Sequence, residues 1–374
     1  MREHYRTRME RGLDTRIEVV ADERDKFLRA ATDGVAMRVG LDVRDPAPGA
    51  EEVRTFTLFE LAEECLRRVG QPYDGSKEEV ITRAMTSSDF PKVLANVANK
   101  SLVEGYRNSG ETWPVWCDTG SASNFKDHYI YRPADDTDLD RVPEGGKIPQ
   151  SGFHVERGAF RIATYGRIFK ISRKAIINDD LNVLSQIPKV YGEATARTVG
   201  DVVYNFLVGN PVMDDGEQLF SSAHNNLAPS GSEPTYDALK QGIQAMLSQK
   251  DAAGKRRLHI RPRYLLTPIA HFLDASEISD LQYIAEADTG IPMFISSSTQ
   301  LIPIAEGRLD DAGSAWYLAG PKGKTVTVFF LDGQKVPKLE VRKGFSMDGV
   351  EFKVLLDFGV TAVDWRALYK NPGA

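Results

Sequence analysis

Apolar residues recur at helical spacing near the start of the chain, which is otherwise dense in charges of both signs. Residues 17–31 carry a narrow apolar stripe, and residues 58–69 carry a second one that closes at Gly70 and Pro72. Short helices without partners are marginal in water, so we expect neither to form much of a core alone. The pattern predicts a flexible N-terminal arm that packs on another surface.

The pattern changes between residues 85 and 106, where a third helix is predicted to open at Pro91 with its apolar positions on one face. Ser88 or Asp89 is suited to cap this helix, and Pro91 occupies a favoured first position. The residues of the apolar face are Val93, Leu94, Val97, Ala98 and Leu102.

The longest predicted helix covers residues 188–208 and would be about 31 Å long at about 1.5 Å per residue. The polar residues 178–180 give a start signal before it, Pro188 either opens or kinks it, and Gly209 with Pro211 ends it. Its apolar stripe consists of Tyr191, Ala194, Val199, Val202, Val203, Phe206 and Leu207.

A long hairpin is predicted where the chain is least like a core. Residues 131–147 are polar, acidic and rich in turn formers, and possible strands at residues 127–132 and 153–171 flank them. Excursions of this length are uncommon inside a compact domain. With so few apolar residues of its own, the hairpin must pack on another surface or stay mobile.

Helices and strands alternate between residues 213 and 335, which predicts a mixed domain. The expected helices cover residues 236–249 and 268–286, and the expected strands cover residues 263–267, 301–304, 315–319 and 325–331.

The clearest strand signal lies at the end of the chain. Apolar residues occupy every second position from Val350 to Ala362, which is the period of a strand with one buried face. A turn at residues 347–349 precedes it, and residues 339–341 supply a partner strand. The chain as a whole is therefore expected to be of the α+β class.

Composition and charge narrow the class of protein. The 374 residues are enough for two packed domains, and a net charge of −6 argues against a dedicated nucleic-acid binder. Cys65 and Cys117 are far apart and lack a C-x-x-C partner, which favours a reducing compartment. No apolar run approaches the length of a membrane span, and the N-terminus does not resemble a signal peptide. We therefore expect a chain made in the cytoplasm, without a membrane partner.

Candidate chemistry is sparse. Only His224, in the polar segment 220–226, suggests catalysis, and hydrogen bonding within a loop is the simpler interpretation. The sequence lacks a G-x-S-x-G elbow, an H-E-x-x-H motif and a complete P-loop. Asp135, Asp136 and their neighbours lack the glycine and glutamate of an EF-hand. We expect no catalytic residue, no cofactor and no metal site.

One basic segment stands out against the acidic whole. Its five cationic residues could contact a phosphate backbone or pair with an acidic patch on a neighbouring subunit. They are Lys255, Arg256, Arg257, Arg261 and Arg263.

Five ordered blocks, which together span residues 81–374, resemble a family of tailed-bacteriophage major capsid proteins with the HK97-type fold. Members are often fused to a prohead protease, and the family is related to Mu-like major head subunits. Residues 1–80 are too short for that protease, so the resemblance covers the capsid portion only. The blocks are RAMTSSDFPKVLANV (83–97), RIATYGRIFKISRKAIINDDL (161–181), NPVMDDG (210–216), SSAHNNL (221–227) and VDWRALYKNPG (363–373).

The resemblance implies an architecture of a peripheral domain (long spine helix plus antiparallel sheet), an axial domain, an extended β-hairpin loop and an N-terminal arm. Mapped onto the chain, it gives an N-terminal arm or helical extension (1–80), a first part of the peripheral domain (81–126), the extended loop (127–171), the spine helix (172–212), the axial domain (213–335) and the C-terminal strands of the peripheral domain (336–374).

The resemblance further implies a major capsid protein, and not an enzyme, that self-assembles into pentamers and hexamers of an icosahedral shell around double-stranded DNA. The implied partners are further copies of the chain, scaffold or prohead protease, portal and decoration proteins, with weak non-specific contact to packaged DNA. The implied location is the virion, after assembly in the host cytoplasm. Two alternatives remain: an encapsulin-like compartment, which shares the fold, and a soluble hydrolase that uses His224.

Overall fold

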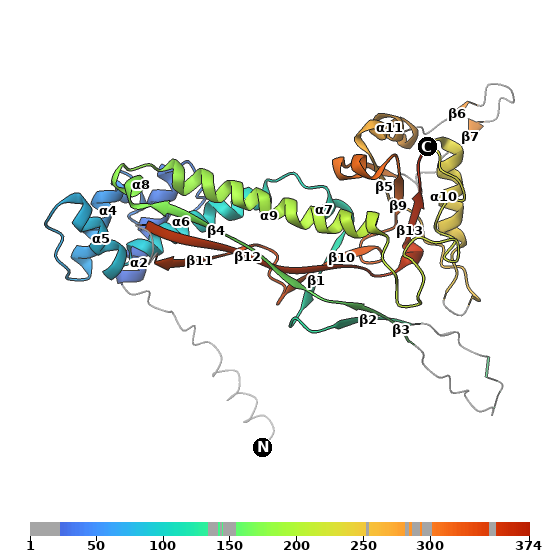
Figure 1. Cartoon of the computed structure of the whole chain (residues 1–374), viewed down its shortest axis with the longest axis horizontal. Coiled ribbons are helices and arrows are strands. Elements are labelled where there is room, and N and C mark those ends of the chain that lie inside the picture. Colours follow the sequence, from blue (N-terminus) through green and yellow to red (C-terminus); the bar gives the residue numbers. More distant parts are fainter. Residues whose placement is uncertain are drawn as a thin grey trace, which may run out of the picture. The chain divides into compact units, whose positions relative to one another are not determined.

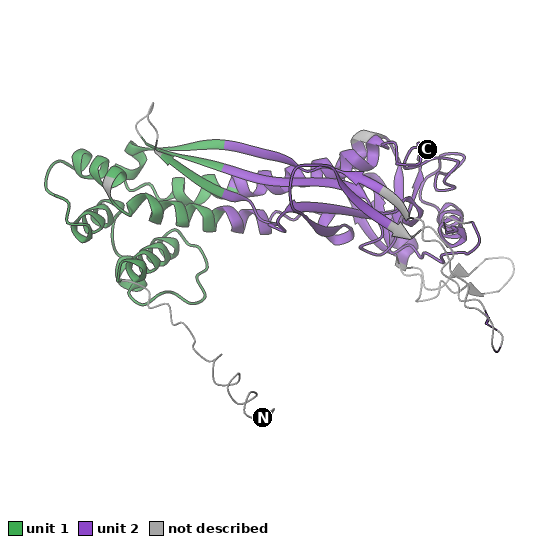
Figure 2. Ribbon diagram, turned by 90° about the horizontal axis from the view of Figure 1, so that it is seen from below, with its two compact units in different colours: residues 1–101, 168–189, 339–353 green, residues 102–167, 190–338, 354–374 purple. Residues whose placement is uncertain are grey.

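The computed structural model describes residues 23–133, 141, 142, 144, 155–251, 254–280, 284, 285, 292, 293, 301–343 and 349–374 (Figure 1). These residues combine helices with β-sheets, so the predicted α+β class is confirmed. They divide into two compact units (Figure 2). Unit 1 takes its described residues from Met1–Ser101, Ile168–Lys189 and Leu339–Lys353, and unit 2 from Leu102–Arg167, Val190–Lys338 and Val354–Ala374. The boundaries of the six expected segments stay predictions.

Unit 1 is mainly helical, and two of its helices begin with capping boxes. The side chains of Thr57 and Ser76 each accept a hydrogen bond from the backbone of a glutamate three residues on, whose carboxylate accepts one in return. The helices are α2 (Glu23–Arg38), α3 (Ala50–Val53), α4 (Leu58–Arg68), α5 (Lys77–Ser87), the first part of α6 (Phe90–Arg107), α8 (Arg173–Ile177) and the first part of α9 (Asn182–Gly209). The helix predicted over residues 58–69 is confirmed as α4, and the helix predicted to open at Pro91 is confirmed as α6.

Two aspartates hold the N-terminal helices within unit 1. Arg24 pairs with Asp89, just before α6, and its hydrogen bond holds the pKa of Asp89 below the usual value. Asp179 pairs with Arg38 in the last turn of α2 and accepts the Leu58 N–H at the start of α4, at 2.8 Å. Of the expected N-terminal arm, residues 23–80 are thus helices and turns fastened to α6 and to the turn after α8.

The larger sheet is built around its longest strand, β12. Along β12, buried and less buried residues alternate, as the period-two pattern predicted, and the expected partner strand is β11. The strand order is β1-β10-β12-β11, with β4 also paired to β12; β1 joins parallel to β10, so the sheet is mixed. The strands are β1 (Asp118–Ala122), β4 (Ala163–Ser172), β10 (Val326–Leu331), β11 (Lys338–Lys343) and β12 (Gly349–Ala362).

A second, four-stranded sheet lies in unit 2, in the order β13-β9-β5-β8. The strands predicted over residues 263–267, 301–304 and 315–319 and the helix predicted over residues 236–249 are confirmed. The elements are α10 (Tyr236–Ser248), β5 (Tyr264–Thr267), η1 (Ile269–His271), α11 (Phe272–Asp280), β8 (Ile302–Ala305), η3 (Gly307–Ala312), β9 (Trp316–Ala319), η4 (Trp365–Ala367) and β13 (Leu368–Asn371).

Three predicted elements have different bounds in the structure. The strand expected over residues 153–171 is two strands, β3 (Val155–Phe160) and β4, because the chain changes partner from β2 (His128–Pro133) to β12. The helix expected over residues 268–286 ends at Asp280, and residues 284–285 form β6, paired with β7 (Pro292–Met293). The long helix, α9 (Asn182–Gly209), begins six residues before Pro188, which lies inside it.

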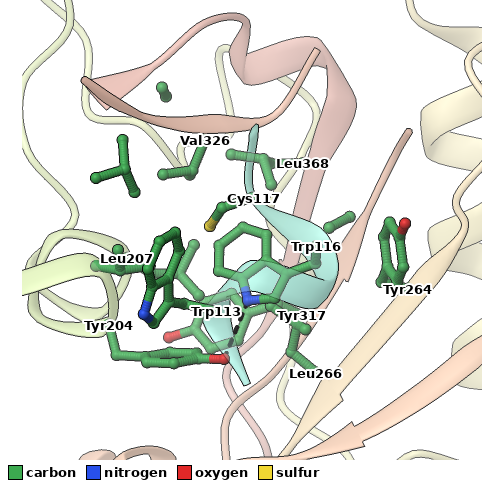
Figure 3. Packing of buried hydrophobic residues seen from close by; sticks show 14 of the residues in the cluster. Trp113, Trp116, Cys117, Tyr204, Leu207, Tyr264, Leu266, Tyr317, Val326 and Leu368 are labelled. Carbon is green, nitrogen blue, oxygen red and sulfur yellow. Dashed lines mark hydrogen bonds between the residues drawn. The ribbon is translucent and has the colours of Figure 1, made fainter. Parts of the chain in front are cut away.

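The core of unit 2 gathers aromatic side chains from distant parts of the chain (Figure 3). The indole N–H of Trp116 donates to the hydroxyl of Tyr204 on α9 at 3.0 Å, and the hydroxyls of Tyr204 and Thr112 lie 2.7 Å apart. Burial raises the pKa of Tyr204, which therefore stays neutral. The hydroxyls of Tyr204 and Thr112 and the indole N–H of Trp116 therefore have partners, whereas the buried hydroxyl of Tyr317 and the indole N–H of Trp113 in the same core have none among the described residues.

Two glycines let α9 approach its neighbours in unit 2. A Cβ on Gly192 would overlap the carbonyl oxygen of Leu102 and lie 2.8 Å from the backbone nitrogen of Tyr106, both on α6. A Cβ on Gly200 would overlap the Glu111 carboxylate and lie 2.8 Å from the guanidinium of Arg308. Glycine is unfavourable inside a helix, so its use here reflects the space that these neighbours need.

Gly192→Ala is expected to lower the free energy of unfolding by about 1–3 kcal/mol, because the added methyl group overlaps backbone atoms of α6. Gly209→Ala is the matched control, since nothing lies within 4 Å of a Cβ added there. That variant should change stability by less than about 1 kcal/mol. Urea unfolding followed by circular dichroism compares the two, and equal losses would contradict the close approach of α9 to α6.

Candidate assembly interface

The hairpin of β2 and β3 has one face that packs within unit 2. The two strands are antiparallel, with His128 opposite Phe160 at the base. The ring of Phe160 stacks on His128 at 5.2 Å and on Phe329 of β10 at 4.0 Å, between centroids. This contact attaches the base of the hairpin to the larger sheet.

Polar contacts reinforce the same attachment. The backbone N–H of Ala159 donates to the Asp214 carboxylate at 3.2 Å, and Arg161 pairs with Asp127 at 2.9 Å. The base of the hairpin is therefore held in place by both apolar and polar contacts. The acidic tip predicted from the sequence, with its aspartates and Lys147, lies outside the described residues.

The other face of the hairpin presents aromatic rings to solvent. Tyr129 and Tyr131, two residues apart on β2, are 42% and 66% exposed, and their ring centroids lie 6.4 Å apart. Nearby in sequence, Phe125 is 46% exposed. Large aromatic side chains gathered on one exposed face are typical of a surface that is covered in an assembly.

A second exposed apolar group lies beside the edge of the four-stranded sheet. Leu273 on α11 is 77% exposed, Ile269 on η1 is 58% exposed, and Ile302 on the edge strand β8 is 40% exposed. An edge strand has unpaired backbone groups, so it is also suited to pairing with another chain. Sequence reasoning missed this surface, although Leu273 beside Asp274 in a short helix was a signal for it.

The structure gives His224 a role in fastening a loop. One ring nitrogen lies 2.9 Å from the Asp215 carboxylate and the other 3.2 Å from the carbonyl oxygen of Leu219. The ring stacks on Trp365 at 3.9 Å, and its backbone carbonyl accepts a hydrogen bond from Gln249 at 2.8 Å. Both nitrogens are engaged and the side chain is 4% exposed, so this geometry offers nothing to a substrate.

The Asp215 carboxylate is stabilised in its charged form. Burial alone would raise the pKa of Asp215, but hydrogen bonds from His224 and from the backbone of Glu217 outweigh it, and the pKa is lowered. The hydrogen bond between Asp215 and His224 therefore stabilises the loop.

Other candidate chemistry is equally absent from the part of the chain that the structure describes. Within it, no group of three metal-ligating side chains lies close enough to hold a metal ion. None of the described helices is both long and apolar enough to cross a membrane. Cys65 and Cys117 are buried and free, and burial raises the pKa of Cys65 to about 12, which keeps this thiol unreactive.

The basic residues predicted between residues 255 and 263 are all exposed, in the segment that leads into β5. The two kinds of candidate site residue therefore differ in exposure: His224 is buried in a loop, and the cationic residues face solvent.

Comparison with known proteins gives one family. The family model for phage capsid protein matches residues 157–371, more than half of the chain. No curated protein matches the chain. Among solved structures, the chain is similar to a virus-like particle from Pyrococcus furiosus, with 13% identity, a TM-score of 0.45, and 73% of this chain and 96% of that chain covered.

Two further structures are similar. The capsid of a native GTA particle has 9% identity and a TM-score of 0.47, with 69% of this chain and 88% of that chain covered. The holo-SrpI encapsulin complex from Synechococcus elongatus has 10% identity and a TM-score of 0.46, with 71% and 89% covered.

Asp215→Asn tests the fastening of the loop. Because the folded-state pKa of Asp215 is lowered, its contribution to stability is present above the unfolded-state pKa of about 3.9 and is lost as pH falls through the folded-state value. The variant should therefore be less stable than the parent chain at pH 7, and the difference should vanish near pH 2. Urea unfolding at both pH values measures this.

Glu217→Gln, in the same turn, is the control for Asp215→Asn and should leave stability nearly unchanged at both pH values. A loss that is the same for both variants, or the same at both pH values, would show that the hydrogen bond with His224 does not hold the loop.

Proposed function

The chain belongs to the phage capsid protein family, and from this premise we propose that it is the major capsid subunit of a tailed-phage head. Copies of the chain form pentamers and hexamers that close into an icosahedral shell around double-stranded DNA. The observation that carries the proposal is the family match over residues 157–371. The described chain also contains the long helix, hairpin and antiparallel strands that the HK97-type fold implies.

The hairpin of β2 and β3 supplies the main contact between copies in this proposal. Its inner face is fixed to β10 through Phe160 and Phe329, while Tyr129 and Tyr131 on the outer face stay exposed in a single chain. A neighbouring subunit that covers these rings removes their apolar surface from water, which stabilises the contact. We therefore assign residues 127–171 to the extended loop that crosses onto a neighbour.

The rest of the proposed architecture follows the same order along the chain. α9 is the spine helix, and the four-stranded sheet with α10 and α11 forms the axial domain. The exposed group around Leu273 and the edge strand β8 then lies where copies meet within a ring. Residues 23–80 form a helical extension of the peripheral domain.

The physics of a closed shell requires many modest contacts. Repeated heterologous contacts form a closed assembly only when the rotation from each subunit to the next returns to the first subunit. A typical stable interface buries about 1,600 Å². Linking several contacts to different neighbours raises the strength of the whole far above that of each one. Scaffold or prohead protease, portal and decoration proteins complete the proposed set of partners, with assembly in the host cytoplasm and residence in the virion.

The double substitution Tyr129→Ser with Tyr131→Ser tests the hairpin contact. Each tyrosine that is covered on assembly removes apolar surface from water, and every 1.4 kcal/mol lost changes an equilibrium about tenfold. We expect the variant to fold with unchanged stability and to need at least about tenfold more protein for assembly. Light scattering and negative-stain electron microscopy over a concentration series measure this.

Tyr73→Ser is the matched control, because Tyr73 is 48% exposed and lies in the helical extension. It should assemble like the parent chain. Normal assembly of the double variant would remove the hairpin from the interface.

A further inference from the structure

One end of the four-stranded sheet in unit 2 collects the basic residues of three separate segments. In the strand register, Tyr264 at the start of β5 lies beside Ala319 at the end of β9, and Leu368 at the start of β13 lies on the other side of Ala319. The segments that enter or leave the sheet at this end are residues 255–263, 320–324 and 365–367. We call this region the basic end of the sheet.

The charge of the basic end opposes that of the whole protein. Residues 255–263 contain five basic residues and no acidic one, in a chain whose net charge is −6. Lys322 and Lys324 add two more cations from the turn after β9. All seven side chains are exposed, and Asp364, which precedes residues 365–367, is paired with Arg366.

The backbone beneath these cations is fixed. The Arg263 N–H donates to the carbonyl of Ala319, and the Ile302 N–H donates to the carbonyl of Arg263, both at 2.8 Å. Ile260 is 6% exposed and contributes to the apolar core under the sheet. Burial alternates along this extended segment, so Arg261 and Arg263 both point to solvent, about 6.6 Å apart along the chain.

Three arginines of the basic end lack an acidic partner in the part of the chain that the structure describes. Among the described residues, no carboxylate forms an ion pair with Arg257, Arg261 or Arg263. The guanidinium of Arg263 lies over the ring of Tyr264, at 5.8 Å from its centroid. The positive charge is therefore available to an external anion.

We propose that the basic end of the sheet binds the phosphate backbone of nucleic acid, an inference that rests on the proposed function of the chain as a shell subunit. A duplex carries about one negative charge per 1.7 Å of its axis, so a group of neighbouring cations meets phosphates at any position along it. Arginine is especially suited to phosphate because its planar fork donates two parallel hydrogen bonds. A folded protein partner would instead favour cations interleaved with acids, and residues 255–263 contain no acidic residue.

The test compares two triple variants of the full chain that remove the same charge. The first carries Arg257→Gln, Arg261→Gln and Arg263→Gln. The control carries Arg107→Gln, Lys126→Gln and Lys240→Gln, which are exposed cations elsewhere in unit 2. Binding of a fluorescent duplex DNA of mixed sequence to unassembled subunits is measured by anisotropy between 50 and 200 mM salt.

The first variant should bind at least about tenfold more weakly at 50 mM salt. The slope of log affinity against log salt should fall by about 2.7, since each lost phosphate contact removes about 0.9. The control should keep the affinity and slope of the parent chain within about twofold.

An unchanged slope in the first variant, or equal losses in both variants, would overturn the proposal. Loss of assembly with intact DNA binding would also overturn it and would identify the basic end as a contact between copies. Failure of the proposed function is seen separately, because electron microscopy of the parent chain would then show no closed particles.

Discussion

The close approach of α9 to its neighbours is the constraint on which the rest of unit 2 depends. Gly192 admits the backbone of α6, and Gly200 admits the ion pair of Glu111 with Arg308. Arg308 also pairs with Glu306 at 3.1 Å and with Asp201 on α9 at 2.6 Å, so one guanidinium joins three separate segments. Burial raises the pKa of Glu111, although the charge of Arg308 opposes this.

The packed core of unit 2 supports the exposed surface of the hairpin. The side chains of Val199, Val203 and Leu207 on α9 are fully buried among the aromatic residues around Trp116. Because β10 belongs to the same core, the stacking of Phe160 on Phe329 carries this rigidity to the base of the hairpin. The exposed tyrosines of the hairpin are therefore presented by a fixed platform, which lowers the entropy lost when a neighbouring subunit covers them.

Elements set by local pattern could be predicted from the sequence, and elements set by distant partners could not. The period-two alternation located β12, and the apolar face of α6 proved fully buried at Val93, Leu94 and Val97. The division at Arg161 and Ile162 was missed because no turn residue marks it; the chain crosses there over Gly359 of β12. Likewise, no spacing in the sequence joins Glu111 to Arg308, and the engagement of both His224 nitrogens follows only from the fold.

The central claim is that copies of this chain close into a shell, and electron microscopy of the purified full chain over a range of concentrations tests it most directly. The account predicts uniform closed particles, together with rings of five or six copies at lower concentration. A homogeneous monomer at every concentration, with the fold intact by circular dichroism, would contradict it.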